Sequence, residues 1–121
     1  MIDSYTAFMM MYYILDAAAD ELDSESVLNY ASIANPFVFK DEGSADPAVY
    51  AAFKEAWDNK FGESNSVVPE DCKAFIKAYM EDRSKECLEA FNLVVDDATW
   101  EEDLKDVQEQ TQERRDYIAG K

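Results

Sequence analysis

The sequence predicts an all-α fold, an irregular bundle of five or six short helices in a single domain spanning residues 1–121. Three observations support this prediction. The chain has 121 residues, of which 48% are hydrophobic and 13% aromatic, enough to bury one core without a metal or disulfide. It has only three Gly and three Pro, too few for the many tight turns of a sheet-rich protein. Its apolar residues also recur every three or four positions, as they do on amphipathic helices.

The first helix is expected over residues 4–21. Residues spaced mostly three or four apart form its apolar stripe: Tyr5, Phe8, Met9, Tyr12, Leu15 and Ala19. Met10, Met11 and Tyr13 lie beside this stripe and make it wider than that of an ordinary surface helix. Two interpretations follow from the extra width. Either the helix packs against the chain on more than one side, or a partner covers part of it.

A second helix is expected over residues 24–34. Asp23 or Ser24 can act as its N-cap, because either side chain can accept a hydrogen bond from the first free backbone N–H groups. Asn35–Pro36 should end the helix, since the residue before a proline avoids the helical conformation.

The longest irregular segment is expected at residues 37–45. It contains two phenylalanines, which could present apolar surface to a partner, because loops carry function more often than helices do. The alternation of Phe37, Val38, Phe39 and Lys40 favours a different interpretation, in which both rings are buried and the other two side chains face solvent.

A third helix is predicted over residues 47–61 by a start signal and a stop signal. Asp46–Pro47 places an acidic N-cap directly before a proline at the first helical position. Gly62 follows the last apolar residue, where a glycine commonly ends a helix.

A fourth helix should begin at Pro69, with two acidic residues in its first turn to interact with the positive end of the helix dipole. Its apolar face consists of Cys72, Phe75, Ile76, Tyr79 and Met80. The pattern weakens near residues 83–84 and resumes at Cys87. We therefore expect a break or bend at that point.

The last helix is expected over residues 100–118. Thr99 and Glu102 have the spacing of a capping box, in which each side chain bonds the backbone N–H of the other residue. A narrow seam follows at helical spacing: Trp100, Leu104, Val107, Thr111, Arg114 and Ile118. The pair Arg114–Arg115 is interpreted as cations favoured near the negative end of the helix.

The charge is strongly unbalanced, with 27 acidic and 11 basic residues, no histidine and a net charge of −16. Such a surface repels phosphate backbones and anionic lipids, so we expect no direct contact with nucleic acid or a membrane. The acids concentrate in two regions. Residues 1–39 hold six acids and no Lys or Arg, and residues 96–109 hold seven acids and only Lys105. Whether the two regions share one face depends on how the helices cross.

The sequence offers little catalytic or ligand-binding chemistry. Without histidine there is no Ser-His or Cys-His nucleophile system. The acidic segments do not match the ligand spacing of an EF-hand, and three scattered glycines make no phosphate-binding loop. Cys72 and Cys87 lie too far apart in sequence for a zinc or redox motif, and we expect both to be reduced thiols in the core. No catalytic, cofactor or metal site is therefore expected, and the protein is not expected to be an enzyme.

A cytoplasmic location is expected. The apolar stretch at residues 8–15 is preceded by Asp3 and by no Lys or Arg, which is the wrong charge for an export signal. It is also far shorter than the roughly 20 residues that span a bilayer.

The leading hypothesis for function is a protein–protein interaction module, of the inhibitor or immunity kind, that binds a basic surface on its partner. The candidate contact residues are Asp97, Glu101, Glu102, Asp103 and Asp106. One alternative is a nucleic-acid mimic, whose carboxylates stand in for phosphates and block a DNA-binding protein. Another is an accessory protein that self-associates through its first or last helix, so the oligomeric state, monomer or dimer, stays open.

Overall fold

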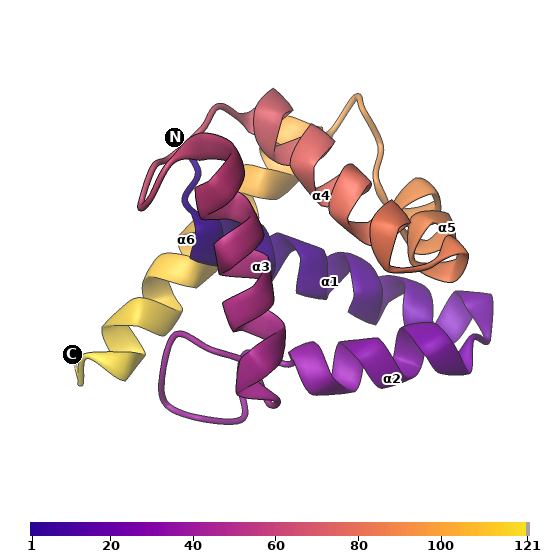
Figure 1. Ribbon diagram of the computed structural model, residues 1–121, viewed down its shortest axis with the longest axis horizontal. Helices are drawn as coiled ribbons and strands as arrows, with labels where there is room; N and C mark the ends of the chain where they lie inside the picture. The colour runs from indigo at the N-terminus through magenta and orange to yellow at the C-terminus, as the bar shows by residue number, and fades with distance from the viewer. Residues whose placement is uncertain (121) are drawn as a thin grey trace.

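Six α-helices make up the computed structural model, which describes residues 1–120 (Figure 1). Their bounds are α1 Ser4–Leu22, α2 Glu25–Ala34, α3 Pro47–Phe61, α4 Pro69–Arg83, α5 Lys85–Val94 and α6 Trp100–Ile118. Within the described residues the only β-type pairing is an isolated bridge between Ile2 and Val67. The predicted all-α bundle is confirmed, with six helices within residues 1–120.

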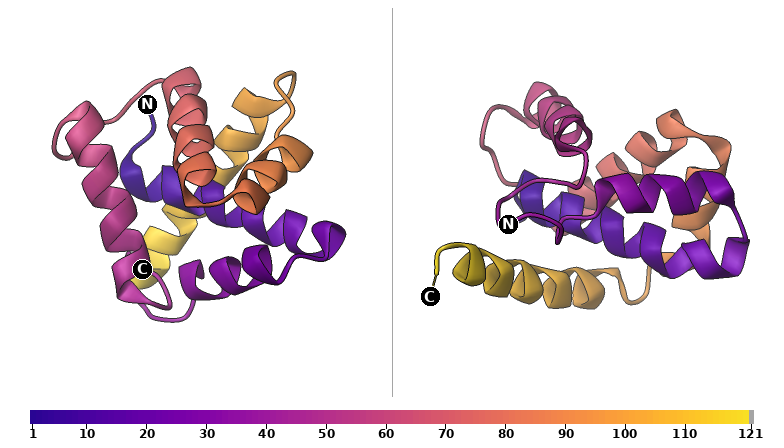
Figure 2. Two further views of the ribbon diagram at one scale, coloured as in Figure 1. Left: turned by 45° about the vertical axis from the view of Figure 1, so that its right-hand side comes forward. Right: turned by 90° about the horizontal axis from the view of Figure 1, so that it is seen from below.

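Helix α1 lies at the centre of the bundle and contacts all five other helices. Seen from below, α6 covers one side of α1 while α2, α3, α4 and α5 lie on the other (Figure 2). Ten of its side chains are buried as a result: Tyr5, Thr6, Ala7, Phe8, Met9, Met10, Met11, Ile14, Leu15 and Ala18. The wide apolar stripe thus reflects packing on more than one side, the first of the two interpretations.

The helix ends follow from local capping, as the sequence indicated. Ser24 accepts a hydrogen bond from Val27 N at 3.3 Å and caps α2. Asp46 caps α3 by accepting from Ala48 N at 3.1 Å. Gly62 ends α3 with a φ of 97°, and a Cβ there would lie 2.5 Å from Asn65 Nδ2. A side chain at this position would therefore be strained and would also clash.

The break predicted near residues 83–84 separates α4 from α5. Ser84 is extended, with φ −171° and ψ 161°, and its hydroxyl accepts from Cys87 N at 3.1 Å. Ser84 therefore ends α4 and caps the N-terminus of α5.

The capping box predicted at the start of α6 is wrong. The Thr99 side chain accepts no backbone N–H, and its hydroxyl lies 2.9 Å from Asp103 Oδ2 instead. The physical reason is its backbone conformation, φ −113° and ψ 2°, which is not the extended conformation of a side-chain cap. Asp96, which accepts from Ala98 N at 2.9 Å, orders the turn before the helix.

An aromatic cluster fills the space between α1, α3 and α4. Its centre is Trp57, which is fully buried beside Phe53, Phe61 and Phe75, with ring centroids 4.8–6.4 Å apart. The indole Nε1 donates to the Asn65 carbonyl at 2.9 Å, so the only polar group of this ring is satisfied.

Candidate functional site

The five candidate acids are all exposed, but they do not form one compact group. Asp97 lies in the turn before α6 and accepts a hydrogen bond from Lys73 Nζ at 3.0 Å. Glu101, Glu102, Asp103 and Asp106 lie in the first two turns of α6. Within the part of the chain that the structure describes, none of these four forms an ion pair. Lys105 lies among them on α6 but is not within ion-pair distance of any of them.

Two of the candidate acids border a groove between α1 and α6, which we call the α1–α6 groove. Its volume is about 370 Å³. Its lining residues are Met10, Tyr13, Ile14, Asp16, Ala17, Val94, Val95, Trp100, Asp103, Asp106 and Val107. The structure thus brings Asp103 and Asp106 together with Asp16 of α1, whereas Asp97, Glu101 and Glu102 do not line the groove. Asp16 is a site residue that the sequence analysis did not single out.

The floor of the α1–α6 groove is apolar and deeply buried. Met10, Ile14, Trp100 and Val107 lie at its base and are at most 7% exposed. Trp100 Nε1 donates to the Pro69 carbonyl at 2.9 Å, which satisfies its polar group and fixes the orientation of the ring. Side chains of the hydrophobic core therefore form the base of the groove.

Helical geometry places the acids at the edges of this floor. Trp100 and Val107 belong to the seam that α6 packs against α1. Asp103 comes three residues after Trp100 and four residues before Val107, so its side chain lies on the same side of α6 as theirs. On the facing helix, Asp16 stands at the edge nearest Tyr13. Burial, together with the negative charge of Asp16, raises the pKa of the Tyr13 hydroxyl.

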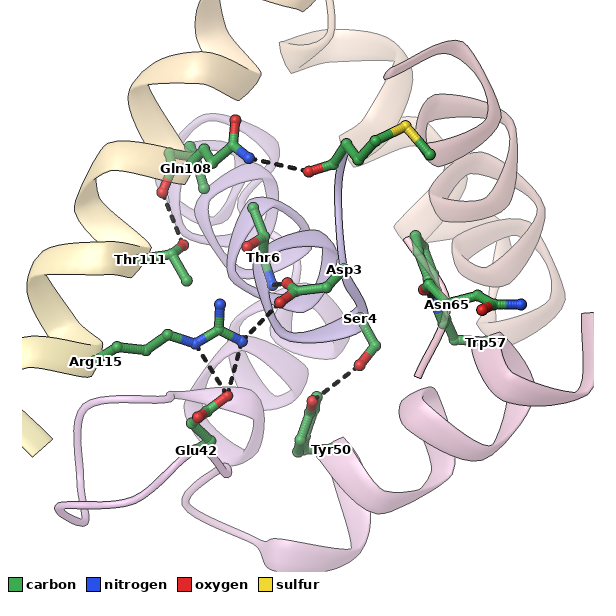
Figure 3. Close-up of polar contacts among 12 residues, drawn as sticks. Asp3, Ser4, Thr6, Glu42, Tyr50, Trp57, Asn65, Gln108, Thr111 and Arg115 are labelled. Atoms are coloured by element: carbon green, nitrogen blue, oxygen red, sulfur yellow. Dashed lines mark hydrogen bonds and ion pairs between the residues drawn. The ribbon is translucent and has the colours of Figure 1, made fainter. Parts of the chain in front are cut away.

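The arginine pair near the end of α6 has a role that sequence reasoning missed. Arg115 Nη2 lies 2.8 Å from Asp3 Oδ2 and 2.9 Å from Glu42 Oε1, and so joins α6 to the N-terminus and to the loop before α3 (Figure 3). Arg114 Nη2 donates to the Phe39 carbonyl at 2.6 Å. The sequence did hold one indication of this role. Arg114 continues the apolar seam of α6, and a side chain in that seam points toward the other helices.

The expectation that both loop phenylalanines are buried is wrong. Phe37 is 42% exposed, and Val38 and Phe39 are each 53% exposed. Alternation between two faces requires an extended strand, but this segment is a series of turns and bends. Phe37 packs edge-on against Tyr12, with ring centroids 5.9 Å apart, and the Arg114 guanidinium lies 5.4 Å from its centroid.

Stability at acidic pH should depend on the Asp3 carboxylate. Burial by itself raises the pKa of Asp3, but the hydrogen bonds from Thr6 and the charge of Arg115 outweigh it and hold the pKa below 3.8. A carboxylate with a depressed pKa contributes stability above its unfolded pKa, and that contribution is lost as the pH falls through its folded pKa. The wild-type protein should therefore lose more unfolding free energy between about pH 6 and pH 3 than Asp3→Asn does.

Asn is the matched substitution because it also serves as an N-cap, and so it preserves the bond that Asp3 Oδ1 accepts from Thr6 N at 3.0 Å. Since Asp3 and Arg115 are about one-third exposed, the difference should be modest, on the order of 1 kcal/mol. Urea unfolding at the two pH values measures it. Equal losses for the two proteins would show that the ion pair contributes nothing.

Both cysteines are buried and unpaired, as expected for core thiols. Burial raises the pKa of the Cys72 thiol to about 12 and also raises that of Cys87. Both are therefore protonated at neutral pH, when a thiol is a poor nucleophile. Across residues 1–120, no three Cys, Asp or Glu side chains gather in a way that could hold a metal ion. None of the helices in that range has the length and apolar character needed to cross a membrane.

No family model, curated protein or solved structure matches the chain.

Proposed function

We propose that this protein is a non-catalytic, cytoplasmic protein-binding module, of the inhibitor or immunity kind, that uses the start of α6 to bind a basic surface on a partner. One observation carries the proposal. The exposed acids Glu101, Glu102, Asp103 and Asp106 have no cation paired with them among the described residues, and two of them border an apolar groove. Concentrated like charge costs stability through self-repulsion, and a partner that supplies Lys or Arg would relieve that cost.

The physical basis is electrostatic complementarity. A cluster of one sign attracts a partner of the opposite sign over about 10 Å at moderate salt, which raises the association rate and disfavours acidic partners. The net charge of −16 adds to the attraction that the protein as a whole exerts on a basic partner. Apolar surface next to the charges then supplies contacts that salt does not screen.

A second candidate function, self-association, is favoured by the exposed loop. The Arg114 guanidinium lies 5.4 Å from the Phe37 ring centroid and 5.0 Å from that of Tyr117. Tyr117 is 57% exposed and Phe37, Val38 and Phe39 are also exposed, so this end of the molecule presents apolar surface. Most of the apolar stripes of α1 and α6 is buried by contacts within the chain, which disfavours self-association through these two helices. Repulsion between two chains of −16 charge opposes association at low salt.

Affinity capture at two salt concentrations tests the protein-binding proposal. The wild-type protein is immobilised beside the variants Asp103→Lys + Asp106→Lys and Glu55→Lys + Glu81→Lys. The control acids are exposed on α3 and α4, and both variants change the net charge equally. We expect a basic protein to be retained by the wild type and the control at about 0.05 M salt, where charges are weakly screened. The α6 variant should retain much less of it.

The outcomes separate the candidate functions. Equal retention by all three proteins would contradict the role of α6. If duplex DNA displaces the captured protein, the nucleic-acid mimic is favoured, because the partner then uses its DNA-binding surface. If instead the protein captures only itself, self-association replaces the proposal.

A further inference from the structure

We infer that the α1–α6 groove receives an apolar side chain from a basic amphipathic helix of the partner, with Lys or Arg of that helix facing Asp16, Asp103 and Asp106. This inference rests on the proposed function and specifies the chemistry of the partner segment. Three observations support it: an apolar lining, carboxylates on both walls, and exposed residues at the rim.

The floor accepts an apolar group because its surface is apolar side chain. Met10, Ile14, Trp100 and Val107 close its base and are almost fully buried, so the apolar surface that a partner can reach belongs to Tyr13, Ala17, Val94 and Val95. The base and the two valines offer no hydrogen bond to a polar ligand, since the indole N–H of Trp100 already donates to the Pro69 carbonyl. Burying an apolar side chain of the partner here removes two apolar surfaces from water.

The rim selects for positive charge. Asp16 stands on the α1 wall, and Asp103 and Asp106 stand on the α6 wall. Among residues 1–120, no Lys or Arg lines the groove. A helix with Lys or Arg on both sides of its apolar stripe would place cations along both walls, whereas an acidic amphipathic helix would meet repulsion on both sides.

The form of the groove favours a helix over a small enclosed ligand. Asp16, Ala17, Asp103 and Asp106 are all exposed, so the lining opens to solvent along both walls. A volume of about 370 Å³ is near the lower end of small-ligand pockets, roughly 300–1,000 Å³, which enclose most of the ligand. An amphipathic helix instead lays one face into such a groove and leaves the other in water.

The test uses a defined probe, a peptide of about 18 leucine and lysine residues with leucines at i, i+3, i+4 and i+7, long enough to form a helix. Calorimetry measures its Kd for the wild-type protein, for Ala17→Trp and for Ala51→Trp. Ala17 lines the groove and is exposed, so tryptophan there fills the groove without a change of charge. Ala51 is exposed on α3 and serves as the matched control.

We expect Ala17→Trp to weaken binding at least roughly tenfold, the loss expected when one apolar side chain cannot enter. Ala51→Trp should bind like the wild type. A leucine–glutamate peptide of the same pattern should not bind, and a leucine–lysine peptide with scrambled order should bind less tightly. Circular dichroism and thermal unfolding establish that each variant is folded.

Two results would overturn the inference while leaving the proposed function intact. The first is an unchanged Kd for Ala17→Trp together with weakened binding by Asp103→Lys + Asp106→Lys, which would show that charge alone attracts the peptide. The second is equal binding of the ordered and scrambled peptides. Failure of the proposed function would look different, because then neither the charge variant nor the groove variant would change Kd.

Discussion

Replacement of Trp57 by alanine is expected to lower the free energy of unfolding by about 3–5 kcal/mol, as for other buried aromatic residues. Trp57 is fully buried at the centre of the cluster that joins α1, α3 and α4. Its loss leaves a cavity among Phe53, Phe61 and Phe75 and removes the hydrogen bond from Nε1 to the Asn65 carbonyl.

Urea unfolding followed by circular dichroism measures the effect. Domains of this size are stable by about 5–15 kcal/mol, so Trp57→Ala should leave the fold marginal, with a melting temperature lower by ten degrees or more. Trp57→Phe is the matched control. It keeps an aromatic ring, loses the hydrogen bond and part of the volume, and should cost about half as much or less. A loss below about 1 kcal/mol for the alanine variant would contradict the central role of this cluster.

The helix bounds were predictable because they depend on signals between near neighbours. Asp46–Pro47 and Gly62 define α3 in the sequence, and the structure places its ends at Pro47 and Phe61. The break at Ser84 was visible because the apolar period lapses there. The width of the stripe on α1 left two interpretations open, packing on several sides or cover by a partner, and the structure shows the first.

The conformation of the loop was not predictable, because distant residues determine it. Arg115 pairs with Glu42, 73 positions earlier, and Arg114 donates to the carbonyl of Phe39, 75 positions earlier. Local rules assigned the arginines to the helix dipole and both phenylalanines to the core. The pairing with distant residues instead holds the loop against α6 and leaves Phe37 and Phe39 partly in solvent.

The candidate site was predictable in part. Clustering along the sequence identified the acids at the start of α6, but it could not show which of them lie beside apolar surface. That depends on the packing of α6 against α1, which brings Asp16 from one acidic region next to Asp103 and Asp106 from the other. The two regions of excess acid therefore meet at the α1–α6 groove, although about 90 residues separate them in the chain.

In the proposed interaction, carboxylates at this groove, and not net charge alone, attract a basic amphipathic segment. The most direct test is the Kd of the leucine–lysine peptide for Asp103→Lys + Asp106→Lys compared with Glu55→Lys + Glu81→Lys. Each variant moves the net charge from −16 by the same four units, so a difference between them reports the position of the charge. Each exposed charge pair contributes roughly 0.2–1 kcal/mol to the binding free energy. Replacing an aspartate by lysine removes that contribution and adds repulsion between the new lysine and the lysines of the peptide.

For this measurement we predict that the α6 variant binds roughly 30- to 100-fold more weakly than the wild type at about 0.05 M salt. The Kd of the control variant should stay within about threefold of the wild-type Kd. The difference in Kd between the two variants should become smaller at about 0.5 M salt, because salt screens the charges more strongly there. Equal losses in the two variants would mean that only the total charge matters. That result would contradict the account.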